Sequence, residues 1–340
     1  MGDRGRSVLR RILGTFVLCC LLLVIAGGLI YKQEISDTFR ALTFDPSPRA
    51  VEVLDAIELT PGGERLFLAS RPTVDGSQHF NAQCAEVDHS EQGHVLGCYV
   101  NQRIRLFDVQ DERVTGIVEV TAAHELLHAA YARLGERDRQ ALARELRDVF
   151  DELSANDPAL AERMAVYEHL SPAAFANELH SVLGTEVREL PESLEAHYAQ
   201  WFSDRAGLID RFEAFHSVFA EFSAQAEAIE LEMSTLRRDV EARSAEYEAE
   251  VKRFNGDAAV FQARNERFEF SDDVDGFERI RSELSERRDW LQAMQEGLQA
   301  DIEHYNALRE QLRELGRLST DLDQQLDSTL APPTTRPTEQ

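Results

Sequence analysis

Two long heptad runs constrain the C-terminal half of the chain more than any other feature. In each run, apolar residues recur at alternating steps of four and three, the spacing of a coiled-coil seam. The first run comprises Leu208, Phe212, Phe215, Phe219, Phe222, Ala226, Ile229, Met233, Leu236 and Val240. The second comprises Phe277, Ile280, Leu284, Leu291, Met294, Leu298, Tyr305, Leu308, Leu312 and Leu315. The repeats predict two helices of roughly fifty residues, each ~75 Å long at 1.5 Å per residue.

The similar lengths of the two runs favour an intramolecular antiparallel hairpin over residues 206–330. Asn255-Gly256-Asp257 and Ser271-Asp272-Asp273 are expected to break the helix between the runs. Arg287 and Asp301 interrupt the second seam. A dimeric coiled coil is the rival arrangement, so this region could also bind a protein partner or associate with a second copy.

Residues 12–31 form an uncharged, mostly apolar run that is long enough to cross a bilayer as a helix. Four arginines and a single aspartate precede it, so the positive-inside rule places residues 1–11 in the cytoplasm and exports the rest. A cleaved signal peptide, with Ala26-Gly27-Gly28 as its site, is the alternative. The run is longer than a usual signal sequence, and we therefore predict a retained single-pass anchor in the cell membrane.

The composition argues against one class of function and indicates the source of the protein. The formal net charge of -26 argues against nucleic-acid binding, because phosphates would be repelled. The basic residues are almost all Arg, with Lys32 and Lys252 as the lysines, a bias that indicates GC-rich coding and a bacterial source.

Residues 32–50, which contain two prolines, are predicted to be a juxtamembrane linker. The proline- and threonine-rich tail, residues 331–340, is predicted to be disordered.

Cys84 and Cys98 lie in the exported part, where an oxidising compartment permits a disulfide. We predict a structural disulfide that closes a loop of about 14 residues and stabilises the fold by up to ~3 kcal/mol on the chain-entropy model. Two separate buried thiols are the alternative.

A His-Glu-x-x-His motif, His124-Glu125-Leu126-Leu127-His128, stands in a segment with helical character. Positions i and i+4 share a helix face, so His124 and His128 can present two imidazoles to one metal ion. Glu125 can then reach a metal-bound water and accept its proton. Zinc suits this set, because it binds neutral imidazole and keeps a position for water. A hydrogen-bonded core pair is the alternative.

Two strands are predicted just before this helix, Val95–Val100 and Ile104–Val109, joined through Asn101-Gln102. Their sheet could offer an edge to an extended peptide, or serve only as a surface on which the helix packs. Helical patterns follow at 136–153 and 158–170.

The next predicted helix begins at Ser171-Pro172, an N-cap followed by proline at the first helical position. It contains Asn177-Glu178-Leu179-His180-Ser181, which resembles the Asn-Glu-x-x-Ala/Ser form of the second helix of gluzincin zinc metallopeptidases. The resemblance covers about residues 95–205. It implies that His124, His128 and Glu178 bind one zinc ion per chain, with Glu125 as general base.

Some roles stay open within this resemblance. Other candidates for the third ligand are His180, Glu186 and His197. The family often places an Asp shortly after the ligand Glu to orient the first His, but Ser181 and Val182 occupy that region here, so the role is unassigned.

The oxyanion donor is a further open role. Gluzincins commonly take it, a Tyr or His, from a later segment. Tyr198 in the predicted helix 192–202 is our candidate and His197 the second. A core Tyr198 with its hydroxyl satisfied is the alternative.

The sequence thus predicts a mainly α (α+β) protein, with a zincin-like domain at 51–205 that includes a small β-sheet and precedes the helical hairpin. The expected function is hydrolysis of an extracytoplasmic peptide or protein substrate by a membrane-anchored zinc metallopeptidase. The alternative is a non-enzymatic, membrane-anchored coiled-coil scaffold with a structural or vestigial zinc site. Glu125 argues for the enzyme, because a structural site needs no base beside its first ligand.

Overall fold

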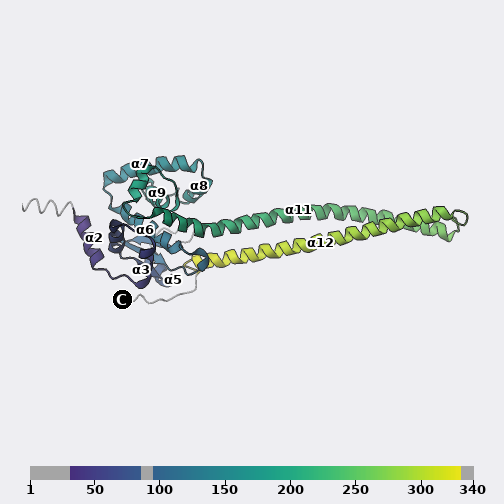
Figure 1. Cartoon of the computed structure of the whole chain (residues 1–340), viewed down its shortest axis with the longest axis horizontal. Helices are drawn as coiled ribbons and strands as arrows, with labels where there is room; N and C mark the ends of the chain where they lie inside the picture. The colour runs from purple at the N-terminus through teal and green to yellow at the C-terminus, as the bar shows by residue number, and fades with distance from the viewer. Residues whose placement is uncertain (1–30, 86–94, 331–340) are drawn as a thin grey trace, which may run out of the picture. The chain divides into compact units, whose positions relative to one another are not determined.

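The computed structural model describes residues 31–85 and 95–330, and these residues are mainly helical (Figure 1). The chain divides into two compact units, the first comprising residues 1–218 and 322–340 and the second residues 219–321. A mainly α fold with a small sheet and a long C-terminal helical region is therefore confirmed. The predicted membrane span, apart from Tyr31, and the C-terminal tail lie outside the described residues.

The first unit contains a three-stranded sheet with β3 at its centre. Strand β3 (Arg103–Phe107) pairs antiparallel with β2 (Gly97–Val100) and parallel with β1 (Thr73–Asp75). The predicted β2–β3 hairpin is present, and both residues of its turn, Asn101 and Gln102, have positive φ, as a two-residue type I′ turn requires. Strand β1 was not predicted, because three residues are too few to show an alternating pattern.

Residues 32–50 are not the linker that the sequence suggested. They form helix α2 and the start of α3, and α2 packs against α4. Pro48 stands at the first position of α3 and Ser47 caps that helix, so this proline starts a helix rather than marking an open segment. Within residues 31–85, the helices are α2 (Lys32–Leu42), α3 (Pro48–Ala56), α4 (Pro61–Ala69) and α5 (Ser77–Cys84).

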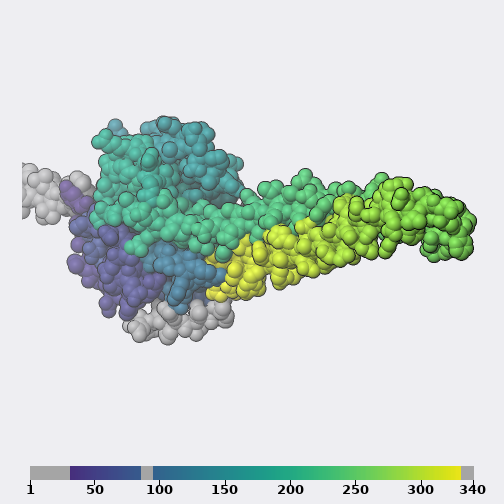
Figure 2. All heavy atoms as spheres, turned by 45° about the vertical axis from the view of Figure 1, so that its right-hand side comes forward, coloured from purple at the N-terminus to yellow at the C-terminus, as the bar shows by residue number. Residues whose placement is uncertain are grey.

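Helix α6 lies at the centre of the first unit, where it contacts α9, the sheet, α3 and α4. In the space-filling view, the purple N-terminal helices and the teal segment after residue 130 form one body (Figure 2). The predicted N-cap of α9 is confirmed, since the Ser171 hydroxyl accepts a hydrogen bond from the Ala174 amide. These helices are α6 (Ile117–Arg133), α7 (Glu136–Ser154), α8 (Pro158–Ala165), α9 (Pro172–Glu186) and α10 (Glu192–Tyr198).

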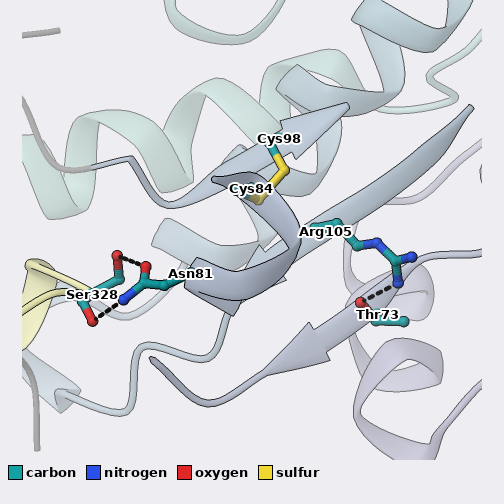
Figure 3. Close-up of a disulfide and its surroundings, with 6 residues drawn as sticks. All are labelled: Thr73, Asn81, Cys84, Cys98, Arg105 and Ser328. Carbon is teal, nitrogen blue, oxygen red and sulfur yellow. Dashed lines mark hydrogen bonds between the residues drawn. A yellow bond between two sulfur atoms is a disulfide. The ribbon is translucent and has the colours of Figure 1, made fainter. Parts of the chain in front are cut away.

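The disulfide between Cys84 and Cys98 joins the end of α5 to strand β2 (Figure 3). Its Cα atoms are 6.1 Å apart, an ordinary separation for a disulfide. On the same helix, the Asn81 amide donates to the Ser328 carbonyl and accepts from the Ser328 hydroxyl. Helix α5 therefore links the edge of the sheet to the residues that follow helix α12 (Val274–Leu326).

The C-terminal half forms the antiparallel helical hairpin within one chain. Helix α11 (Arg205–Glu266) and helix α12 (Val274–Leu326) are joined by a short turn at the second predicted break. The two charged residues that interrupt the second seam pair across the hairpin, Arg287 with Asp257 at 2.6 Å and Asp301 with Arg243. No helix within residues 31–85 and 95–330 is both long and apolar enough to cross a membrane.

Two details of the hairpin differ from the prediction. Helix α11 continues through Asn255-Gly256-Asp257, because a glycine in a helix costs only about 1 kcal/mol and the contacts across the hairpin offset it. The first unit also extends into α11 as far as Val218, rather than ending at 205. The reason is that Leu208, Ile209 and Phe212 are buried.

Candidate metal centre

His124 and His128 lie on one face of α6, and their ring centroids are 4.8 Å apart. The potential ligand atoms of His124, Glu125 and His128 all lie within 4.8 Å of one another. The His-Glu-x-x-His motif is thus a spatial cluster as well as a sequence pattern. Two imidazoles that share one helix face can bind a single ion.

Helix α9 brings the carboxylate of Glu178 to this cluster. The Glu178 Oε2 atom is 3.6 Å from His124 Nε2 and 3.4 Å from His128 Nε2. The close approach of α9 to α6 depends on Gly184, where an added Cβ would overlap Leu127 of α6 and lie 2.6 Å from a ring carbon of Tyr198. A residue with a side chain at 184 would push the two helices apart and withdraw Glu178.

The spacing of these three groups fits zinc. Ligands at 2.0–2.1 Å from a tetrahedral zinc ion lie about 3.3 Å from one another, close to the separations measured from Glu178. Two imidazole nitrogens and one carboxylate oxygen are also the donor set of a catalytic rather than a structural zinc site, because a fourth position stays open.

The side chain of Glu125, a residue of α6, is buried against the edge strand β2. It is only 6% exposed, and strand β2 passes directly over it. A Cβ atom at Gly97 would lie 2.9 Å from Glu125 Oε1 and 2.6 Å from the Thr121 methyl group. Gly97 therefore allows the strand to approach the carboxylate. Sequence reasoning missed this residue, because nothing local distinguishes it from any other glycine in a strand.

The cluster of His124, Glu125, His128 and Glu178 opens into a cleft of about 500 Å³. One wall is strand β2 with the two residues before it, and another is the beginning of α11, where Phe212, Phe215 and His216 line the cleft. The guanidinium of Arg163 lies 4.8 Å from the centre of the Phe212 ring and forms an ion pair with Glu186. The cleft thus combines the metal cluster, an apolar wall and a half-buried ion pair.

Ser181 contacts one of the candidate ligands. Its hydroxyl oxygen is 3.3 Å from His128 Nδ1, the ring nitrogen that does not face Glu178, and Ser181 is fully buried. Groups that hold the second ring nitrogen fix the orientation of a metal-binding histidine. The sequence left the orienting role unassigned, and the structure brings Ser181 to the second histidine rather than the first.

We expect Ser181→Ala to weaken zinc binding by about tenfold, the lower end of the range for groups that orient a ligand. A competition titration with a chromogenic chelator measures the change. Thr185→Ser, one turn later on α9, is the control, because the Thr185 hydroxyl donates to the Ser181 carbonyl and serine keeps that bond. Equal zinc affinity of Ser181→Ala and the parent would remove this role from Ser181.

Glu178 and His128 shift each other's pKa in opposite directions. Burial alone would lower the pKa of His128, but the nearby Glu178 carboxylate raises it to about 9. Burial would raise the pKa of Glu178, but His128 and His124 hold it well below its usual range. In the metal-free protein at neutral pH, Glu178 is therefore an anion and His128 carries a proton.

A pH dependence of zinc binding follows from the His128 proton. Zinc needs the neutral imidazole, so binding at neutral pH releases about one proton from His128. The apparent zinc affinity should rise about tenfold per pH unit from about pH 6 to pH 8, and this contribution should end near pH 9. Calorimetry at neutral pH in two buffers of different ionisation enthalpy measures the protons released. Binding without proton release would contradict the assignment.

The two predicted oxyanion donors do not face the cleft. Tyr198 is fully buried, its hydroxyl donates to the His180 carbonyl at 2.8 Å, and burial raises its pKa. One ring nitrogen of His197 is 2.9 Å from a ring nitrogen of His180. Neither Tyr198 nor His197 is among the residues that line the cleft. Tyr198 is therefore a core residue that braces α9 against α10, and both proposed catalytic roles are corrected.

The other third-ligand candidates are also engaged elsewhere. His180 is buried against His197 and Tyr131, and burial together with the His197 charge lowers its pKa well below the usual value. Glu186 lines the cleft but pairs with Arg163. Among the four candidates, Glu178 is the one whose side chain contacts both His124 and His128.

Comparisons of the chain with protein-family models, with curated proteins and with solved structures found no match. The geometry and chemistry of the His124–Glu125–His128 cluster and its cleft are therefore the basis for inferring a function.

Proposed function

We propose that this chain is a zinc-dependent peptidase in which His124, His128 and Glu178 bind the metal and Glu125 is the general base. The observation that carries the proposal is the meeting of Glu178 with both histidines, beside a buried Glu125, in an open cleft. This third ligand comes from a separate helix, 50 residues after His128 and 54 after His124 along the chain.

The position of β2 at the edge of the sheet is the observation that favours a peptide as substrate. In the described residues, β2 pairs with β3 on one side, and β2 also lines the cleft. An extended peptide can add to such an edge through main-chain hydrogen bonds. Its side chains would then meet the apolar wall at Phe212 and Phe215, which favours an apolar residue there.

In the proposed hydrolysis, the metal and the protein side chains would have different roles. When bound, zinc would polarise the scissile carbonyl and lower the pKa of the attacking water. Glu125 accepts the proton of that water and passes it to the leaving amine. Tyr167 and His216 line the cleft and replace Tyr198 and His197 as candidates for donors to the carbonyl oxygen. Burial and the Arg163 charge lower the pKa of His216, so it acts as a neutral donor.

The proposed site of action is outside the cytoplasmic membrane. The sequence predicts an anchor at residues 12–31, and the Cys84–Cys98 disulfide belongs in an oxidising compartment. The proposed enzyme is thus a single-pass membrane protein whose catalytic unit is exported.

A membrane-anchored scaffold is the second candidate function. Phe268, in the turn between α11 and α12, is 81% exposed and adopts a positive φ, a conformation that disfavours a bulky residue. An exposed, strained aromatic residue favours a contact with a protein partner. A scaffold of this kind needs no Glu125, whereas the peptidase does.

Mass spectrometry of a diverse peptide mixture incubated with the full-length protein tests the proposal. A zinc peptidase should create new peptide termini, a strong chelator should stop the reaction, and added zinc should restore it. A zinc-loaded protein that cleaves nothing, while its Phe268 variants lose a partner, would favour the scaffold.

A further inference from the structure

Helix α2 exposes a narrow apolar face. Tyr31, Ile35, Phe39 and Leu42 are between 56% and 82% exposed, the first of them directly before the helix. They are separated by steps of four, four and three residues, which places them on one side of a helix. The stripe is thus continuous along the whole length of α2.

The opposite face of α2 is fixed to the first unit. Asp37 forms a two-pronged ion pair with Arg133, with distances of 2.7 and 2.9 Å. Arg40 donates to the carbonyls of Ala69 and Gln102, both at 2.8 Å. These bonds hold α2 in one orientation, and the apolar stripe lies on the side of the helix away from them.

The sequence before α2 indicates what covers this stripe. Tyr31 is both the first residue of the stripe and the last residue of the uncharged run 12–31. A helix that directly follows a membrane span starts at the membrane surface. Aromatic and aliphatic side chains on one face, with a basic residue such as Lys32 beside them, are typical of helices that lie in the bilayer interface.

We infer that α2 is an interfacial helix, whose stripe of Tyr31, Ile35, Phe39 and Leu42 inserts into the headgroup and upper acyl region of the bilayer. The exposed stripe then needs no protein partner, because lipid covers it. The predicted anchor supplies attachment, and the stripe adds a second contact that fixes orientation.

The ion pair that fixes α2 connects it to α6, the helix that carries His124 and His128. Arg133, which binds Asp37, is the last residue of α6, and it also donates to the Tyr99 hydroxyl in the cleft wall at 3.0 Å. His128 lies five residues earlier, a rise of ~7.5 Å along the helix. If the proposed function is correct, α2 holds the cleft close to the bilayer and favours peptide bonds near the membrane surface.

Tryptophan quenching by lipid tests the insertion. The full-length chain is reconstituted into phosphatidylcholine–phosphatidylglycerol vesicles, with and without acyl chains brominated near the headgroup. Ile35→Trp and Phe39→Trp report on the stripe, and Ser36→Trp is the matched control, exposed on the same helix but outside the stripe. The signal of the parent, which contains Trp201 and Trp290, is subtracted.

We expect bromolipid to quench the tryptophans at 35 and 39 at least about threefold more strongly than the tryptophan at 36, because only the stripe faces acyl chains. Equal quenching at the three positions would overturn the inference, as would failure of the full-length chain to float with the vesicles. Protection from aqueous iodide at 35 and 39 without bromolipid quenching would also overturn it, since a second copy or another protein would then cover the stripe. The readout involves no hydrolysis, so its outcome is separate from that of the proposed peptidase.

Discussion

Replacing Glu125 by glutamine is expected to leave zinc bound and to reduce peptide hydrolysis by about 100- to 10,000-fold, the usual contribution of a general base. The amide has nearly the same size as the carboxylate and fits the same space beside Gly97, but it cannot accept a proton from water. Zinc stays because His124, His128 and Glu178 are unchanged. Initial rates on the cleaved peptide and metal analysis of the same preparation measure both effects.

The control for this variant is Glu119→Gln on the same helix. Glu119 pairs with Arg49 at 3.7 Å and is not among the residues that line the metal cleft. Its replacement removes the same charge from α6 and should leave the rate unchanged. Normal hydrolysis by Glu125→Gln would contradict the general-base role, and loss of zinc from that variant would indicate that Glu125 is itself a ligand.

The second large effect is expected for Glu178→Ala, which should weaken zinc binding by more than about 100-fold. Groups that only orient a ligand contribute 10- to 100-fold, and a ligand contributes more. The variant also leaves His128 without the carboxylate that raises its pKa. Its proton release on zinc binding should therefore shrink, which calorimetry measures together with the affinity.

Glu186→Ala is the matched control for the third ligand. Both residues are glutamates of α9 and both line the cleft, but Glu186 pairs with Arg163. The control should keep the zinc affinity of the parent within about threefold, because it removes no ligand. Loss of zinc from Glu186→Ala but not from Glu178→Ala would reverse the assignment.

The sequence predicts correctly those features of the protein that depend on local spacing. The i, i+4 separation of His124 and His128 is a property of any helix, and Ser171 before Pro172 starts a helix through bonds within one turn. The Asn101-Gln102 turn is equally local, because its two residues alone must adopt positive φ. The heptad repeat extends this principle over a long distance, since its period specifies the seam.

The parts that the sequence misses depend on contacts between distant segments. Gly97 and Gly184 matter because of what lies opposite each one, Glu125 in the first case and Leu127 in the second. Ser181 acquires its role only because α9 crosses α6 at His128. None of these contacts leaves a local pattern in the sequence.

The wrong predictions have the same origin. The face that Tyr198 shares with its helical neighbours shows that the helix has an apolar side, but not whether that side meets the cleft or the core. The Tyr198 hydroxyl donates a hydrogen bond to the His180 carbonyl in the core. Asn255-Gly256-Asp257 has the composition of a break, yet the segment lies within the long helix α11, and Asp257 pairs with Arg287 of α12 across the hairpin. In both cases the tertiary contacts determine the structure, and the local sequence pattern alone does not indicate it.

The metal content of the purified full-length chain, expressed with zinc supplied, tests whether the chain binds zinc at this site. We predict about one zinc ion per chain in the parent, as expected for a mononuclear site, and a large loss in His128→Ala. A parent that is folded, by its circular dichroism and cooperative melting, but binds no zinc when it is supplied would contradict the claim.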